Sequence, residues 1–475
     1  MKTYSSFRER RLSNTTTTAD ELEVFLQRIQ DRASLNVFLS LNTEEARACA
    51  AESDRRFSDG THRPLEGMIV AVKDNISVKG LPLTCGSRML GDFSPVYDAT
   101  VVSRLRENGA IIVGKTNCDE FAMGSSNETS AFGPVGHPLN QEYVPGGSSG
   151  GSAVAVSDSL CHVSLGSDTG GSIRQPAAFC GVIGFKPTYG RVSRYGLVAF
   201  ASSLDQIGPF AHSIEDVARV YDALSGIDEK DSTSTNAPPD SSLTSLLHHD
   251  DEITVGVVHE SLLEGCSDDI FASYLSSVAA LRAAGIRVIT VDLYGKEAWI
   301  PTYYILATAE ASANLARFDG VRYGHRASVD SETDDVIMRS RSEGFGEEVQ
   351  RRIMLGTFVL SSGYYDAFYK KGQQARRKVV DGYSEIFSRC DVLVLPTTPS
   401  GAFKRGEKTR NPIEMYLNDL FTVSANLAGI PAISVPSGTT SDGFPIGLQV
   451  QAAHNNDAKL LRVTRTIQKL LGDHN

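Results

Sequence analysis

Two glycine-rich segments and one apolar segment carry the side chains best suited to acyl-transfer chemistry. Ser172 lies in GSDTGGSIR, where two glycines directly precede it. Such a loop can turn several backbone N–H groups toward one point beside the hydroxyl, as an oxyanion hole requires. Ser148 and Ser149 lie side by side in GGSSGGS, and Lys73 lies in AVKDN. Together these residues indicate a candidate serine nucleophile with a second hydroxyl and an amine.

A serine nucleophile also needs a base, and the loop around Ser172 contains no histidine. The nearest, His162, belongs to the preceding strand-like stretch CHVSLG. Lysine can act as the base when it is neutral, and burial beside apolar neighbours such as Val70 lowers its pKa. Structural roles also fit each residue taken alone: Lys73 in an ion pair with Asp74, and the serines in turns.

Two other motifs match known patterns but lie in the wrong context. Residues 109–116, GAIIVGKT, match a phosphate-binding loop, yet the apolar residues between the glycines are predicted to be a strand. Their N–H groups then belong to a sheet and cannot converge on phosphates. Residues 146–150, GGSSG, match the nucleophile elbow of α/β-hydrolases, but the polar, proline-containing segment before them is no buried strand. We expect neither a nucleotide loop nor that hydrolase fold.

The net charge argues against direct binding of nucleic acid by this chain alone. Among 475 residues, 46 are Lys or Arg and 57 are Asp or Glu, which gives a net charge of -11. Affinity for a polyanion comes mostly from basic side chains on phosphates, so we expect no direct DNA binding. An acidic chain that takes part in RNA chemistry would need a partner to hold the RNA.

The cysteines and the N-terminal segment indicate a soluble cytoplasmic protein. The 7 cysteines are scattered singly, without a CxxC pair, as is typical of reduced thiols. The sequence MKTYSSFRERRLSN is not followed by the apolar stretch of a secretory signal, and no run of about 18 apolar residues predicts a membrane span. The ten histidines form no HExxH pattern, and we expect no metal site.

Strands and helices alternate along the chain and must position these residues. Thr18 and Glu21 form a capping box, so we expect the chain to open with an amphipathic helix. Its apolar face would contain Leu22, Phe25, Leu26 and Ile29. Further strands are predicted at 67–72, 110–114, 161–166, 253–258, 286–291, 391–396 and 430–436, with helices at 98–108, through 274–281 and from 457.

The alternation favours an α/β fold with a sheet covered by helices on both faces. Residues 124–210 are rich in Gly, Ser and Pro, which predicts functional loop more than regular structure. Residues 228–252 are polar and low in complexity, which predicts a surface insertion. We expect a single domain over residues 1–475, with a Gly/Ser-rich catalytic core at about 60–215.

Taken together, these segments closely resemble the amidase signature family from about residue 20 to residue 470. The resemblance implies a large mixed β-sheet covered by helices on both faces. It also implies a catalytic triad in which Ser172 is the acylated nucleophile, Ser148 is a bridging serine after a cis peptide, and Lys73 is the base. The implied oxyanion donors are the backbone N–H groups of Thr169, Gly170, Gly171 and Ser172.

Three blocks in the second half, at 301–326, 345–373 and 417–436, resemble the A subunits of glutamyl-tRNA(Gln) or aspartyl-tRNA(Asn) amidotransferases. The resemblance implies that Tyr303, Arg352 and Asp419 hold the substrate glutamine. This agrees with the chemistry of glutamine, since an Arg can clamp its α-carboxylate and an Asp can pair with its α-ammonium. From the residues alone, a surface ion pair for Arg352 and a helix cap for Asp419 remain open.

The activity implied is that of a glutaminase subunit in a heterotrimer. It would release ammonia to a B subunit that uses ATP and Mg²⁺ to activate the misacylated tRNA, while a small C subunit binds both. No cofactor is expected in this chain, and the acceptor, Glu-tRNA(Gln), Asp-tRNA(Asn) or both, is left open. The alternative from another enzyme class is a stand-alone amidase of the same family that acts on small amides.

Overall fold

The computed structural model describes residues 3–238, 241–248, 252–328, 335–409 and 412–472. One 11-stranded mixed sheet runs through the molecule in the order β1-β3-β2-β4-β6-β5-β10-β11-β9-β7-β8. Its strands are β1 (Phe38–Leu41), β2 (Ile69–Lys73), β3 (Ile111–Thr116), β4 (Val163–Asp168), β5 (Ile183–Lys186), β6 (Gln206–Ala211), β7 (Thr254–Val258), β8 (Arg287–Val291), β9 (Val392–Pro396), β10 (Ala432–Thr439) and β11 (Pro445–Ala452).

Parallel pairing is confined to two parts of the sheet. β2 runs parallel to β3 and β4, and β7 runs parallel to β8 and β9. The strands between these groups pair antiparallel, and β1 pairs antiparallel with β3 at one edge. The β2–β4 pair matters most here, because the carboxyl ends of adjacent parallel strands open at one edge of a sheet.

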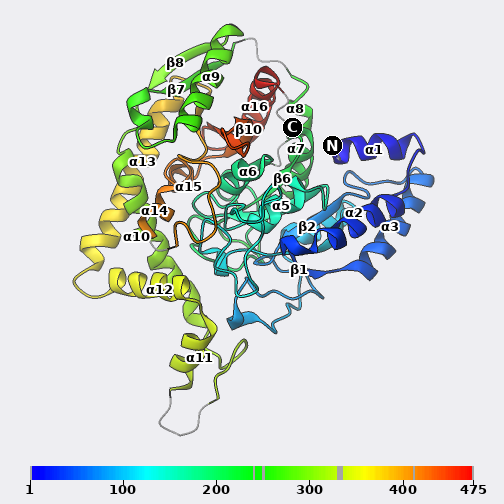
Figure 1. The fold of residues 1–475 in the computed structure, drawn as a ribbon, viewed down its shortest axis with the longest axis horizontal. Helices are drawn as coiled ribbons and strands as arrows, with labels where there is room; N and C mark the ends of the chain where they lie inside the picture. Colours follow the sequence, from blue (N-terminus) through cyan, green and yellow to red (C-terminus); the bar gives the residue numbers. More distant parts are fainter. Residues whose placement is uncertain (1–2, 239–240, 249–251, 329–334, 410–411, 473–475) are drawn as a thin grey trace.

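The helices surround the sheet, with α1, α2 and α3 at one end of the molecule and α10, α12 and α13 at the other (Figure 1). They are α1 (Tyr4–Leu12), α2 (Thr18–Asp31), α3 (Thr43–Ser58), α4 (Thr100–Glu107), α5 (Gly150–Ser157), α6 (Arg174–Cys180), α7 (Ile214–Leu224), α8 (Ser242–Ser245), α9 (Asp268–Ala283), α10 (Lys296–Asn314), α11 (Val336–Gly344), α12 (Glu347–Leu360), α13 (Lys371–Phe387), α14 (Pro412–Leu417), α15 (Val423–Ala428) and α16 (Asp457–Leu471). Figure 1 shows α11 projecting from the body.

The burial of β2 demonstrates that helices cover both faces of the sheet. Val70 and Val72 pack in one hydrophobic cluster with residues of α4 and α7, whereas Ile69 and Ala71 pack in another with residues of α2, α3 and α5. Successive side chains of a strand point to opposite faces, so each face has its own core. The predicted α/β fold is thereby confirmed.

The N-terminal region differs from the sequence prediction. A helix, α1, precedes the predicted one, so the chain does not open with the amphipathic helix α2. The N-cap of α2 is Thr17, whose side chain accepts from the Asp20 amide. Thr18 is instead the first helical residue and is buried against Ser53, to whose hydroxyl its own is hydrogen-bonded. Thr17 and Thr18 both fit the capping pattern. Thr17 is the N-cap because Thr18 is packed against Ser53.

The glycine-rich stretch 124–210 contains more regular structure than predicted. Besides the expected strand β4 and the helix α5, it contains α6, β5 and β6. These elements are short and buried throughout, so they show no alternation of apolar and polar residues. β1 and β11 were not predicted either, whereas all the predicted strands and helices are present, with ends shifted by a few residues.

The polar segment 228–252 is tied to the body at several points where the structure describes it. Asp228 accepts hydrogen bonds from Thr100 and Ser193, and Asp231 accepts from the backbone N–H of Arg194. Asp231 is buried despite the polar sequence around it. Residues 239–240 and 249–251 of this segment lie outside the described residues.

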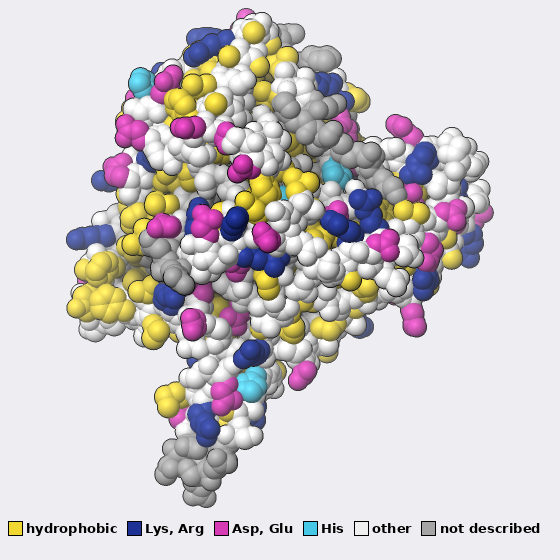
Figure 2. Space-filling model, viewed as in Figure 1, with side chains coloured by type: hydrophobic (Ala, Val, Ile, Leu, Met, Phe, Trp, Pro, Cys, Tyr) yellow, Lys and Arg dark blue, Asp and Glu magenta, His cyan; other side chains and the backbone are white. Residues whose placement is uncertain are grey.

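Acidic and basic side chains are interspersed over the face of the molecule in Figure 2. Hydrophobic side chains gather at the edge where Figure 1 places α12. Here Met354 is 65% exposed and Phe358 48%, and the Phe358 ring lies 4.3 Å from that of Tyr364. Among the described helices, none combines the length and apolar character needed to cross a bilayer.

Candidate active site

The parallel pair β2–β4 brings two of the predicted catalytic segments together. Lys73 is the last residue of β2, and β4 ends at Asp168, four positions before Ser172. Because these neighbours run parallel, both chain segments leave the sheet at the same edge. Ser148 and Ser149 immediately precede α5, which packs against both strands.

The amine of Lys73 is buried among hydroxyl groups. Its Nζ lies 2.7 Å from Ser148 Oγ and 2.9 Å from the hydroxyls of both Ser149 and Ser167. All four side chains are removed from solvent. Burial lowers the pKa of Lys73 to about 8, because a charged ammonium is costly to keep away from water. A neutral amine can donate to two of these hydroxyls and accept a proton from the third.

The alternative of a Lys73–Asp74 ion pair does not fit the structure. Asp74 instead pairs with Lys115, whose Nζ lies 3.0 Å from Asp74 Oδ1, and it also accepts from the Thr84 amide. Lys115 and Thr116 are the residues that matched a phosphate-binding loop, and both are buried in β3. The strand predicted in this motif is therefore present. Within the described residues, the hydrogen-bond partners of the Lys73 amine are hydroxyl groups.

Ser172 adjoins the Ser148–Ser149 segment through the backbone. The Ser149 amide donates to the Ser172 carbonyl oxygen over 3.2 Å, and the peptide bond before Ser148 is cis. Ser172 is 9% exposed, whereas Ser148 and Ser149 are fully buried. Of the three serines, Ser172 is thus the one that a substrate can reach.

The loop before Ser172 is held from two sides. Thr169 donates its hydroxyl to Asp205, and Asp168 accepts from the backbone amides of Gly171 (2.9 Å) and Ile173 (3.1 Å). The Gly171 amide would therefore have to share its hydrogen with a substrate oxyanion. Thr169, Gly170 and Ser172 are the other predicted donors on this loop.

Close packing explains why two glycines stand at 170 and 171. A Cβ on Gly171 would lie 2.2 Å from Thr422 Oγ1, and the φ of Gly171 is 136°, which strongly favours glycine. A Cβ on Gly170 would lie 2.6 Å from Tyr303 Oη. Tyr303 of α10, one of the predicted substrate residues, therefore lies directly against the loop that carries Ser172.

A buried ion pair anchors this loop to the sheet. Arg174 donates to both carboxylate oxygens of Asp168 at 2.9 and 3.1 Å, and also to Gln449 and Asn426. Burial alone would raise the pKa of Asp168, but the Arg174 guanidinium outweighs it and the pKa falls to about 2. Sequence analysis missed this network, since Arg174 and Asn426 are 252 positions apart.

Arg352 of α12 is buried, which excludes the surface ion pair as its setting. It is 3% exposed, its Nε donates to Glu348 Oε1 over 2.7 Å, and its guanidinium lies 5.4 Å from the centre of the Tyr304 ring. Tyr416 also donates to Glu348 Oε1, at 3.2 Å. The neighbouring Arg351 contacts Glu348 too but is far more exposed.

Asp419 does not cap a helix with its side chain. It is 6% exposed, and its Oδ2 accepts from Ser125 Oγ over 2.7 Å. The N-cap of α15 is Thr422 instead. Burial raises the pKa of Asp419 to about 7, and the hydrogen bond from Ser125 opposes the rise.

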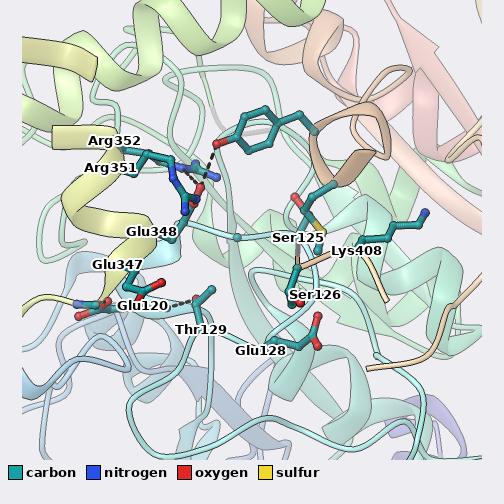
Figure 3. A pocket seen from close by; sticks show the side chains of 15 residues that line it. Glu120, Ser125, Ser126, Glu128, Thr129, Glu347, Glu348, Arg351, Arg352 and Lys408 are labelled. Atoms are coloured by element: carbon teal, nitrogen blue, oxygen red, sulfur yellow. Dashed lines mark hydrogen bonds and ion pairs between the residues drawn. The ribbon is translucent and has the colours of Figure 1, made fainter. Parts of the chain in front are cut away.

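A cavity beside this group is lined by charged and hydroxyl side chains from three parts of the chain, at 120–129, 346–352 and 408–416 (Figure 3). Figure 3 shows Arg352 and Glu348 on one side and Ser125 on the other. The lining residues missed by sequence analysis include Glu120, Ser125, Glu348 and Tyr416. Of these, Glu348 is four positions from Arg352 on one helix, whereas the contacts of Glu120, Ser125 and Tyr416 are made by the fold. Within the described ranges, no group of three or more His, Cys, Asp or Glu is arranged to hold a metal ion.

Known proteins resemble this chain over nearly its whole length. A family model described as Amidase matches residues 20–461. The A subunit of glutamyl-tRNA(Gln) amidotransferase from Salinibacter ruber is 49% identical, with 94% of this chain and 95% of the relative covered. The same subunit from Halalkalibacterium halodurans is 52% identical, with coverages of 93% and 91%.

Solved structures are similar as well. The A subunit of glutamyl-tRNA(Gln) amidotransferase from Thermotoga maritima has a TM-score of 0.78 at 39% identity, covering 96% of this chain and 94% of that one. Native peptide amidase from Stenotrophomonas maltophilia has a TM-score of 0.82 at 29% identity, with coverages of 98% and 96%.

Proposed function

This chain belongs to the amidase family, and from that premise we propose that it is the glutaminase subunit of a tRNA-dependent amidotransferase. One observation carries the proposal beyond family membership: a buried lysine amine lies 2.7 Å from Ser148 Oγ, in the segment hydrogen-bonded to Ser172. Relatives about half identical to the chain, named as the A subunit of glutamyl-tRNA(Gln) amidotransferase, support glutamine as the amide.

Glutamine hydrolysis begins with proton transfer. The neutral Lys73 amine takes a proton from Ser148, which in turn takes the proton of Ser172. The Ser172 oxygen forms a bond to the side-chain amide carbon of glutamine, and the carbonyl oxygen gains a negative charge. Backbone N–H groups of the loop that contains Gly170 and Gly171 stabilise that charge.

Collapse of this intermediate breaks the C–N bond. The proton returns through Ser148 to the leaving nitrogen, which departs as ammonia and leaves a glutamyl ester on Ser172. Water then attacks the ester, with the same lysine as the base, and glutamate is released. Apart from the attacking water, every step uses only groups of this chain and the substrate.

The charges at and beside the cavity fit free glutamine, since Arg352 lines it and Asp419 is hydrogen-bonded to Ser125 of its wall. Arg352 would bind the α-carboxylate and Asp419 the α-ammonium, while Tyr303 would close the space above Gly170. The cavity wall beside Arg352 and the buried setting of both charges support this assignment. A small amide without these charges would form neither ion pair, so the site favours glutamine.

The ammonia would pass to a B subunit, which uses ATP and Mg²⁺ to activate a misacylated tRNA and hold it, and a small C subunit would bind both chains in a heterotrimer. The net charge of -11 supports leaving the tRNA to a partner. The exposed apolar side chains near Met354 and Phe358 support an assembly, because surfaces of this kind commonly mark protein contacts. The acceptor is Glu-tRNA(Gln), and Asp-tRNA(Asn) is the second candidate.

Copurification with B and C subunits, followed by a glutaminase assay with each charged tRNA, tests the proposal. We expect slow glutamine hydrolysis by the isolated chain and faster hydrolysis in the complex with Glu-tRNA(Gln). A stand-alone amidase would instead be fast as a single chain and indifferent to tRNA. A fluorophosphonate should label Ser172, and an unlabelled Ser172 in active enzyme would refute the mechanism.

A further inference from the structure

A turn at residues 119–127 contacts three parts of the site: the segment of Ser148, the side chain of Asp419, and the start of the helix that carries Arg352. Phe121 and Ala122 have φ values of 49° and 61°, and Asn127 has one of 62°. Left-handed conformations are uncommon for residues other than glycine and cost free energy, so they persist where the surroundings enforce them. The turn supplies Glu120, Ser125 and other residues to the cavity wall.

One contact of this turn reaches the catalytic serines. The Asp119 amide donates to the Ser148 carbonyl over 3.2 Å, and the Asp119 carboxylate accepts from the amides of Asn127 and Thr129. Asn127 Oδ1 accepts from the Gly151 amide at the start of α5. The turn is thereby fixed relative to Ser148.

A second contact holds Asp419, the residue proposed to bind the α-ammonium of glutamine. Ser125 of the turn donates to Asp419 over 2.7 Å, across 294 positions of sequence. The peptide oxygen of Ser125 also accepts from Gln175, which lies in α6 behind Ser172.

A third contact fixes the start of the helix that carries Arg352. α12 begins after Gly346, which has no side chain to cap it. The Gly346 amide instead donates to Glu120 Oε2 over 2.9 Å, across 226 positions of sequence. Ser87 donates to Glu120 Oε1, and the rings of Phe121 and Phe345 pack at 5.5 Å beside this contact. Glu120 therefore acts as a remote N-cap for α12.

Glu120 is fitted closely to this place. It is 2% exposed, and a Cβ on Gly346 would lie 2.5 Å from Glu120 Oε2. A carboxylate at a helix N-terminus is stabilised by the helix dipole. Burial nevertheless raises the pKa of Glu120 to about 7, so an ionised side chain here is costly. Apolar packing would fill the same space more cheaply, which indicates a role that depends on the carboxylate.

We propose that Glu120 is a positioning residue for glutamine recognition: by capping α12 it sets the place of Arg352 relative to Asp419, which the same turn holds through Ser125. The inference rests on the proposed function, since it assumes that these two charges bind glutamine. Glu120 itself need not touch the substrate. Without the Glu120 carboxylate, the first turn of α12 should shift, and the Glu348–Arg352 ion pair that begins there should shift with it.

The test compares E120A and E120Q with E66Q in the assembled enzyme. Glu66 is also a buried glutamate, but it pairs with Arg63 and does not line the cavity, so E66Q controls for the loss of a buried carboxylate. The measurements are KM and kcat for glutamine, the rate at which a fluorophosphonate labels Ser172, and the Tm. Fluorophosphonate labelling reports on the nucleophile without needing the glutamine charges.

We expect E120A to raise KM about tenfold, the effect of losing one charge-assisted hydrogen bond, with kcat and labelling changed by less than about threefold. E120Q keeps an acceptor for Gly346 and should raise KM less, which also keeps the test valid if E120A fails to fold. An unchanged KM in E120Q and E120A, or a parallel loss of labelling and glutaminase activity, would overturn the proposal. Failure of the proposed function itself would be seen without any mutation, because the unmutated complex would release no ammonia from glutamine.

Discussion

Lys73 Nζ lies 2.7 Å from Ser148 Oγ although 75 positions of sequence separate them, and both side chains are fully buried. An amine in this setting favours its neutral form, because burial lowers the pKa of Lys73 to about 8. The pair therefore joins a base that is partly unprotonated near neutral pH to a hydroxyl that can relay a proton.

Replacing Lys73 by arginine should remove the base while keeping a cation of similar length. Arginine remains protonated at any accessible pH, so it cannot accept a proton from Ser148. We expect K73R to lower kcat for glutamine by at least about a thousandfold, as for other members of catalytic triads. Steady-state ammonia release measures the loss.

The same lysine should give the unmutated enzyme an ascending limb in its pH profile. Lys73 loses its proton as the pH rises through about 8, so kcat should increase between pH 7 and pH 9. A K73R variant with more than a tenth of the normal activity, or a kcat independent of pH in this window, would contradict the assignment of the base.

Asp419 should make the binding of glutamine depend on pH in a lower window. With a pKa of about 7 in the empty site, its carboxyl is neutral below that pH and ionised above it. Only the ionised form attracts the α-ammonium, so KM should fall as the pH rises from 6 to 8. In D419N, KM should be higher and flat across this range.

Ser125 provides a matched variant for this effect. Its hydrogen bond lowers the pKa of Asp419, so S125A should raise that pKa and move the change in KM to higher pH. KM measured at several pH values tests both variants. A transition that stays in place in S125A would show that another group titrates.

Much of the fold was predictable because its long elements have clear patterns. The strand β2 is apolar up to Lys73, β3 begins with the apolar run Ile111–Val113, and α4 places Val101, Val102 and Leu105 on one buried face. By contrast, β5 and α6 are short and buried on all sides, so they carry no periodic signal. Thr17 and Thr18 both fit an N-cap, and only packing against Ser53 distinguishes them.

The site divides in the same way. Ser148 and Ser172 lie in dense glycine and serine motifs and Lys73 ends an apolar strand, which the sequence displays, although the distances between these residues come only from the fold. Glu348 lies four positions before Arg352 on one helix, so their pairing is a local contact, whereas Glu120 reaches Gly346 only through the fold. Contacts across more than 200 residues decide the role of Glu120.

Gly171 should tolerate no side chain. In G171A the new Cβ would approach Thr422 Oγ1 to 2.2 Å at a φ of 136°, so the loop must move and its N–H groups lose their alignment. Since one oxyanion donor is worth about a hundredfold or more, we expect kcat to fall by that factor. The matched control is G443A, where φ is 83° but no atom lies within 4 Å of a Cβ. Equal losses of kcat in the two variants would attribute the effect to backbone strain alone.

Arg352 and Arg351 allow a matched test of glutamine binding, because they are neighbours on α12 and both contact Glu348. Both side chains line the cavity, but Arg352 is buried beside the ring of Tyr304, whereas the side chain of Arg351 is 42% exposed. An ammonium cannot reproduce the two parallel hydrogen bonds of a guanidinium to a carboxylate, so R352K should raise KM for glutamine by about tenfold or more. R351K should leave KM within about twofold, as expected of a solvent-exposed ion pair.

Initial rates over a range of glutamine concentrations, with fluorophosphonate labelling of Ser172 as the check on the nucleophile, distinguish the two variants. A larger rise in KM for R351K than for R352K would show that Arg351, and not Arg352, binds the α-carboxylate of glutamine.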